Sequence, residues 1–234
     1  MGVITAGNLK WFKCTTYTEG DEHGGAINLS APITSGTKNN IFDDVTDEER
    51  ISGAVEYRKI FFRNGNTAIY TDAKIWIREN TPATNDTIAL LLTGGASKVG
   101  VSVQLPQTSM AFTSGSKAVT GVGTSFLSSL QPGDRIYNGT SDPVAKAVLI
   151  ASIQSDTSLT LSSNYAGTTG GACQGYVAPL SGGAYISAPL KTTGLSPGDI
   201  PGEGYVGVCI RRSVTANGTD GYDGNSFILK VENS

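Results

Sequence analysis

One histidine and three cysteines limit the chemistry that this 234-residue chain could perform. A Ser-His-Asp triad would need His23, which lies in the polar segment 18–25 without a Gly-x-Ser-x-Gly turn beside it. A zinc site typically takes three or four His or Cys ligands, and Cys14, Cys173 and Cys209 form no Cys-x-x-Cys pair. We therefore expect His23 to lie in a solvated loop and the cysteines to be buried free thiols.

Two further motif matches have simple explanations. The pattern Ser-x-x-Lys occurs twice, beginning at Ser35 and at Ser114, but both copies lie in Gly/Ser-rich loops and not at the start of a helix. The glycine-containing segment 121–124 lacks the Gly-Lys-Ser/Thr of a phosphate-binding loop. We expect coincidence in the first case and a tight turn in the second.

Acidic residues gather in two places. Residues 220–225 offer oxygen ligands for Ca²⁺, but their spacing is not that of an EF-hand, and a solvated turn is expected. Thr46 and Glu49 have capping-box spacing and Gly53 would end the element, which predicts one short helix at 46–52. Capping and a polar helix face then account for the second group, which comprises Asp43, Asp44, Asp47, Glu48 and Glu49. The sequence therefore predicts no metal ion and no cofactor.

The composition predicts an all-β protein. With 38% hydrophobic and 16% charged residues the chain can form a sizeable core, and its 30 glycines accompany abundant Thr, Ser and Asn. The net charge of −3 and the scattered basic residues argue against nucleic acid as a partner. No secretory signal and no apolar run of about 20 residues is visible, so no membrane association is expected.

Period-two patterns predict strands near both ends of the chain. Strands are expected at 8–18 and 26–33, and Asn64-Gly65-Asn66 suggests a hairpin that joins strands 55–63 and 68–78. Further alternation appears at 99–105, 204–212 and 226–231. Residues 109–178 contain shorter strands, a long apolar strand at 144–153 and several turns, which predicts a small barrel of about five strands.

These patterns predict an antiparallel β-sandwich that is interrupted by an inserted small β-barrel. The three strands near the C-terminus could not bury a core alone, so they should complete the sheets begun before residue 106. We expect a discontinuous sandwich domain of residues 1–106 plus 179–234, and an inserted barrel domain of residues 107–178.

Five short motifs carry a resemblance to a known group of proteins. The chain has Asn-Ile-Phe-Asp-Asp-Val at 40–45, Glu-Tyr-Arg at 56–58 followed by Asn64, then Ile-Arg-Arg at 210–212 and Ser-Phe at 226–227. This combination resembles structural proteins of tailed-bacteriophage virions, which look like single sandwich domains that carry an insert after the middle strands. Cys209 departs from the pattern, because a larger apolar or aromatic residue is expected there.

The insert carries its own resemblance. Residues 119–126, 132–136 and 152–159 are similar to a small β-module that recurs in phage tail and fibre proteins. Together the two resemblances cover most of residues 39–231. They imply a virion protein made in the host bacterial cytoplasm, and they do not specify its place on head, neck or tail.

The expected function is therefore structural and not enzymatic. A capsid decoration or neck/collar protein, assembled as a homo-oligomer on other virion proteins, is the first hypothesis. A tail or baseplate protein that binds host glycans through the insert is the alternative, and a carbohydrate-active enzyme is the third. The candidate protein–protein interface alternates charged with apolar or aromatic residues, although a solvated strand face would look the same: Glu56, Tyr57, Arg58, Trp76, Arg211 and Arg212.

Overall fold

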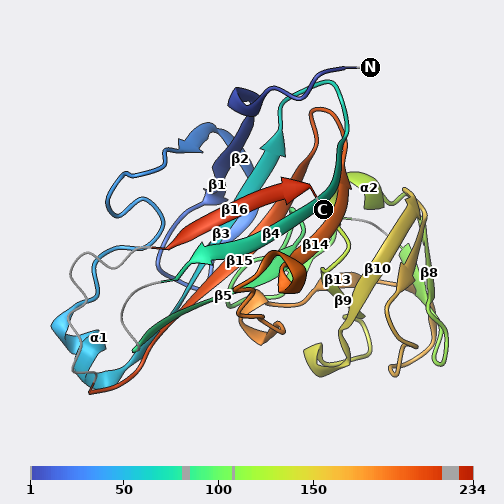
Figure 1. Cartoon of the computed structure of the whole chain (residues 1–234). Helices are drawn as coiled ribbons and strands as arrows, with labels where there is room; N and C mark the ends of the chain where they lie inside the picture. Colours follow the sequence, from blue (N-terminus) through green and yellow to red (C-terminus); the bar gives the residue numbers. More distant parts are fainter. Residues whose placement is uncertain (1, 81–84, 107–108, 218–226, 234) are drawn as a thin grey trace. The chain divides into compact units, whose positions relative to one another are not determined.

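A computed structural model describes residues 2–80, 85–106, 109–217 and 227–233 (Figure 1). The chain is all-β, as the composition predicts, with antiparallel strands in three sheets. It divides into two compact units, the first of residues 1–19, 27–91 and 184–234, and the second of residues 20–26 and 92–183.

Two sheets build the first unit. A five-stranded sheet has the order β2-β1-β3-β15-β5, and a three-stranded sheet has the order β14-β4-β16. The five-stranded sheet contains β1 (Leu9–Thr16), β2 (Gly24–Ile33), β3 (Ala54–Asn64), β5 (Asp86–Thr93) and β15 (Tyr205–Val214). The three-stranded sheet contains β4 (Tyr70–Glu79), β14 (Leu195–Ile200) and β16 (Ile228–Asn233). Strands from both ends of the chain thus share each sheet.

The two sheets of this unit pack face to face through apolar side chains. On β4 Ala73, Ile75 and Ile77 are buried, and the residues between them are more exposed, which confirms the predicted alternation. Phe62 of β3 contacts Tyr70 of β4 edge to face, with ring centroids 6.0 Å apart. The first unit is therefore sandwich-like.

The predicted hairpin around Asn64-Gly65-Asn66 is wrong. Both strands form, but β3 pairs with β1 and β15 while β4 pairs with β14 and β16. The buried Asn64 amide donates hydrogen bonds to the carbonyl oxygens of Ile200 (3.2 Å) and Pro201 (3.1 Å). The asparagine therefore anchors a crossover from one sheet to the other instead of forming a two-strand turn.

The predicted short helix is confirmed as α1 (Asp47–Ser52). The Thr46 hydroxyl accepts the N–H of Glu49, and the Glu49 carboxylate accepts the N–H of Thr46, so the capping box is complete. Gly53 ends the helix with φ of 78°, a conformation that favours glycine.

One sheet of eight strands builds the second unit, in the order β12-β7-β8-β11-β10-β9-β13-β6. The sheet contains β6 (Val103–Gln104), β7 (Ser109–Phe112), β8 (Ala118–Val122), β9 (Arg135–Asn138), β10 (Val148–Ser155), β11 (Ser158–Leu161), β12 (Gly170–Cys173) and β13 (Gly175–Val177), with the short helix α2 (Phe126–Ser129) after β8. Among the described residues its end strands β12 and β6 do not pair, so the sheet does not close into a barrel, and it has eight strands where about five were predicted.

Two predicted strands are shorter than expected. Of residues 99–105 only Val103–Gln104 is strand, because the main chain at Val99 and Gly100 bonds to the loop residues His23 and Asp21. The predicted strand at 144–153 begins only at Val148, since Val144–Lys146 forms a 3₁₀ turn.

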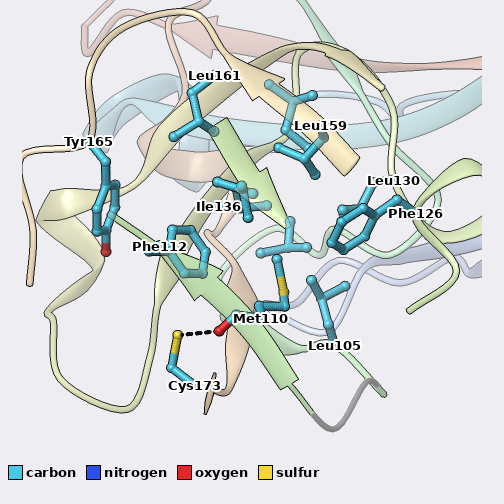
Figure 2. Packing of buried hydrophobic residues seen from close by; sticks show 13 residues of the cluster. Leu105, Met110, Phe112, Phe126, Leu130, Ile136, Leu159, Leu161, Tyr165 and Cys173 are labelled. Carbon is cyan, nitrogen blue, oxygen red and sulfur yellow. Dashed lines mark hydrogen bonds between the residues drawn. The ribbon is translucent and has the colours of Figure 1, made fainter. Parts of the chain in front are cut away.

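Thirteen buried residues form the core of the second unit (Figure 2). The rings of Phe112 and Tyr165 lie 4.9 Å apart, and the Cys173 thiol donates a hydrogen bond to the Met110 carbonyl oxygen at 2.9 Å. The Tyr165 hydroxyl donates to Asp142 at 2.6 Å. Burial raises the pKa of Asp142, but the hydrogen bonds from Tyr165 and Thr168 outweigh it and hold that pKa below its usual value.

Candidate functional site

Two neighbouring strands carry five of the six residues predicted as an interface. In the antiparallel pair of β3 and β15, Glu56 lies opposite Arg212 and Tyr57 lies opposite Arg211. Because side chains alternate along a strand, Glu56, Arg58 and Arg212 share one face of the sheet, and Tyr57 and Arg211 share the other. The predicted interface is thus divided between two faces.

On the first face, the ring of Phe42 lies close to two guanidinium groups. The guanidinium carbons of Arg58 and Arg212 are 5.1 and 4.8 Å from the ring centroid. The ring of Phe227 packs beside Phe42, with centroids 6.3 Å apart. We call this group the Phe42 cluster: Glu19, Phe42, Asp43, Glu56, Arg58, Arg212 and Phe227.

The two arginines of the Phe42 cluster are buried and make several polar contacts. The Arg58 side chain is 2% exposed, and it donates to Glu19 and, at 3.1 Å, to the carbonyl oxygen of Ile41. Arg212 pairs with Glu56 and donates to the carbonyl oxygen of Asp43 at 2.8 Å. These contacts attach segment 41–43 to β3 and β15.

Three carboxylates surround the guanidinium of Arg58. The oxygens of Glu19, Asp43 and Glu56 lie within 4.8 Å of one another, and Arg58 Nη2 contacts all three residues. Arg58 therefore already supplies a positive charge at the centre of a group that could otherwise resemble a metal site. Burial raises the pKa of Glu56, and the neighbouring Arg212 opposes that shift.

On the second face, two tyrosines and an arginine pack together. The rings of Tyr57 and Tyr185 lie 5.6 Å apart, and the guanidinium of Arg211 lies 4.9 Å from the ring centroid of Tyr185. Val55, two residues before Tyr57 and on the same face, is 56% exposed. We call this group the Tyr57 patch: Val55, Tyr57, Tyr185 and Arg211.

Arg211 differs from its neighbour Arg212 in its charge environment. Within the described part of the chain Arg211 makes no ion pair, whereas Arg212 contacts the carboxylates of Glu56 and Asp43. Tyr57, Tyr185 and Arg211 are partly exposed. A carboxylate from another molecule would complete the contacts of this arginine.

The departure at Cys209 is explained by its neighbours. The Tyr185 hydroxyl donates to Cys209 Sγ at 3.1 Å, and the buried Lys59 lies opposite on β3. Burial raises the pKa of Cys209 to about 12, so its thiol remains protonated at neutral pH. All three cysteines are buried and free, which confirms the prediction from sequence.

Trp76, the sixth predicted residue, lies on β4 in the three-stranded sheet and joins neither group. His23 is 1% exposed, so the expectation of a solvated histidine is wrong. The main chain at His23 forms hydrogen bonds with Val99 and Gly20, and the bond with Val99 fixes this polar loop to the segment around residue 99. The candidate Ca²⁺ loop 220–225 lies outside the described residues.

Sequence reasoning missed several members of these two groups. Phe42 and Asp43 belong to a motif that the sequence shows, but Asp43 was assigned to helix capping, whereas it contacts Arg58 and Arg212. Glu19 and Tyr185 lie in irregular segments, so no periodic pattern in the sequence predicts that they join these groups. No helix among the described residues is long and apolar enough to cross a membrane. Comparisons with protein-family models, with curated proteins and with solved structures found no match.

Proposed function

We propose that this chain is a non-enzymatic structural component of a tailed-phage virion, and specifically a capsid decoration or neck/collar protein. Its partners would be other virion proteins and further copies of itself, and it would be made in the host bacterial cytoplasm. Support comes first from the resemblance of its sequence motifs to such proteins. Four of those motifs contribute side chains to the Phe42 cluster: Phe42 and Asp43, Glu56 and Arg58, Arg212, and Phe227.

The observation that carries the proposal is the environment of Arg211 in the Tyr57 patch. Tyrosine and arginine are enriched among the residues that dominate protein–protein binding energies. Arg211 lies over Tyr185 without a carboxylate among the described residues, whereas Arg212 on the other face is paired with Glu56. A partner protein that supplies an Asp or Glu to Arg211 would gain a charge-assisted hydrogen bond at a partly desolvated site.

The variant Arg211→Ala tests this assignment. We expect it to weaken binding to phage particles at least tenfold, because it removes the unpaired guanidinium while Tyr57 and Tyr185 stay in place. The particles would be heads and tails purified separately from a phage that lacks this gene, and binding would be measured by co-sedimentation. Binding to heads supports the decoration or neck role, and binding to tails supports the tail role.

A matched control is Arg78→Ala, which removes an exposed arginine on β4 that pairs with Glu79. This variant should bind as the unmodified protein does. If Arg211→Ala also binds with unchanged affinity, the Tyr57 patch is not the interface. If the unmodified protein binds neither heads nor tails, the structural role itself is overturned.

A further inference from the structure

The strand β2 forms one end of the five-stranded sheet. From Ile27 to Ile33 it belongs to the first unit, and β1 is its neighbour on one side. An end strand presents main-chain N–H and C=O groups that can pair with another extended strand. The binding partner that fits this edge is therefore another β-strand.

The side chains of β2 give this edge little of the protection by charge that end strands usually have. Residues 24–33 contain no charged side chain, and Leu29 is 56% exposed. Within residues 27–33 the odd-numbered positions are all apolar: Ile27, Leu29, Ala31 and Ile33. An uncharged, half-apolar edge of this length is suited to strand pairing.

The other end strands of the first unit are better protected. The strand β14 carries the charged Asp199, and its pairing with β4 is irregular. The strand β16 carries Lys230 and Glu232. Most residues of β5 are buried. Among the described end strands of this unit, β2 is thus the one that is both exposed and uncharged.

We propose that β2 pairs with β2 of a second copy of this chain, in antiparallel orientation about a two-fold axis at Ser30. In this register Ile27 lies opposite Ile33 of the second copy, and Leu29 lies opposite Ala31 of the second copy. Every apolar position then faces an apolar position, and no like charges are brought together. The sequence of the strand is self-complementary, which favours a second copy over an unrelated strand.

Pro32 decides which residues exchange hydrogen bonds in this pairing. Proline has no N–H to donate, and the register places it opposite Asn28 of the second copy. Hydrogen-bonded and non-hydrogen-bonded pairs alternate along an antiparallel ladder. The odd-numbered residues must therefore form the hydrogen-bonded pairs, while Ser30 and Pro32 occupy the sites where no N–H is needed.

Pairing of this kind joins two five-stranded sheets into one continuous ten-stranded sheet. Main-chain hydrogen bonds along residues 27–33 would provide affinity, and the apolar side chains would set the register. The inference deepens the proposed function, because it names the contact through which copies of the chain associate. The contact does not involve the Tyr57 patch, which remains available to other virion proteins.

The variant Ser30→Cys tests the register directly. Opposed residues at a non-hydrogen-bonded site have Cα atoms about 4.5 Å apart, which a disulfide can span. With oxidised glutathione, the two introduced thiols would form one disulfide and release two reduced glutathiones. We expect a covalent dimer on a non-reducing gel that disappears on reduction. The native cysteines should not interfere, because all three are buried.

A matched control is Ser128→Cys, which places a thiol at an exposed position on α2 and should stay free of the cross-link. A second variant, Leu29→Lys, introduces a charge at the centre of the edge. Light scattering should show the mass of two chains for the unmodified protein and of one chain for Leu29→Lys.

Three results would overturn the inference: a monomeric unmodified protein at micromolar concentration, a dimer that Leu29→Lys leaves intact, or no cross-link in the Ser30→Cys variant. The proposed function can fail separately. If the protein dimerises but binds no phage particle, the β2 contact is supported and the virion role is overturned. If the protein is monomeric but binds particles through Arg211, the virion role is supported and the β2 contact is overturned.

Discussion

The variant Phe42→Ala is expected to lower the free energy of unfolding of the first unit by about 3–5 kcal/mol. Phe42 is 7% exposed, and its ring packs against the guanidiniums of Arg58 and Arg212. Removal of the ring would leave a cavity and take away two cation–π contacts. It would also loosen segment 41–43, where the carbonyl oxygens of Ile41 and Asp43 accept hydrogen bonds from Arg58 and Arg212.

Urea unfolding followed by tryptophan fluorescence measures this loss selectively. The chain has two tryptophans, Trp11 and Trp76, and both belong to the first unit. The control Phe42→Leu keeps most of the apolar volume and should cost less than half as much. A loss of less than about 1 kcal/mol in the free energy of unfolding is usual for a substitution at the surface. If Phe42→Ala loses no more than that, the Phe42 cluster does not hold this unit together.

The variant Arg212→Met is expected to cost about 3–5 kcal/mol, because it leaves the Glu56 carboxylate without its main partner. The side chains of Arg212 and Glu56 are 8% and 11% exposed, and Arg212 also binds the carbonyl oxygen of Asp43. The double variant Glu56→Gln with Arg212→Met removes both charges and should be more stable than Arg212→Met alone. The same fluorescence-detected unfolding measures all three proteins.

The pH dependence of this loss has a definite sign. Burial already raises the pKa of Glu56, and Arg212 is the neighbour that opposes the shift most strongly. Without Arg212 the folded-state pKa should rise further. A group with a raised folded-state pKa stabilises the fold at low pH and loses that contribution as the pH rises through the folded-state pKa. The destabilisation should therefore be smaller at mildly acidic than at neutral pH, and a loss that is equal at both would contradict this assignment.

Local alternation was enough to predict most strands of the first unit, because a strand with one buried face repeats every two residues. The pattern could not show which strands pair. Asn64-Gly65-Asn66 suggested a hairpin, yet Asn64 bonds to Ile200 and Pro201, which lie more than 130 residues further along the chain. The sequence offered no sign of that contact.

At the candidate site, strand periodicity identifies only the residues that lie on regular strands. Position along a strand predicts that Glu56 and Arg58 share a face, and the pairing of β3 with β15 adds Arg212 to it. Glu19 and Tyr185 reach the two groups from irregular segments, so only the folded chain identifies them.

The boundaries of the second unit were also not predictable from local sequence patterns. The second unit begins at residue 92 and also takes residues 20–26, whereas the sequence placed the insert at 107–178. Main-chain bonds from His23 and Asp21 to Val99 and Gly100 account for part of that difference. Periodic patterns in the sequence do not predict contacts between segments so far apart in the chain.

The abundance of this chain in purified phage particles shows whether it is a structural part of a virion. Quantitative mass spectrometry of particles banded in a density gradient would give the number of copies for each portal ring. We expect a fixed whole-number ratio that is unchanged by a high-salt wash. A chain that stays in the soluble lysate, or that leaves the particles during that wash, would contradict it.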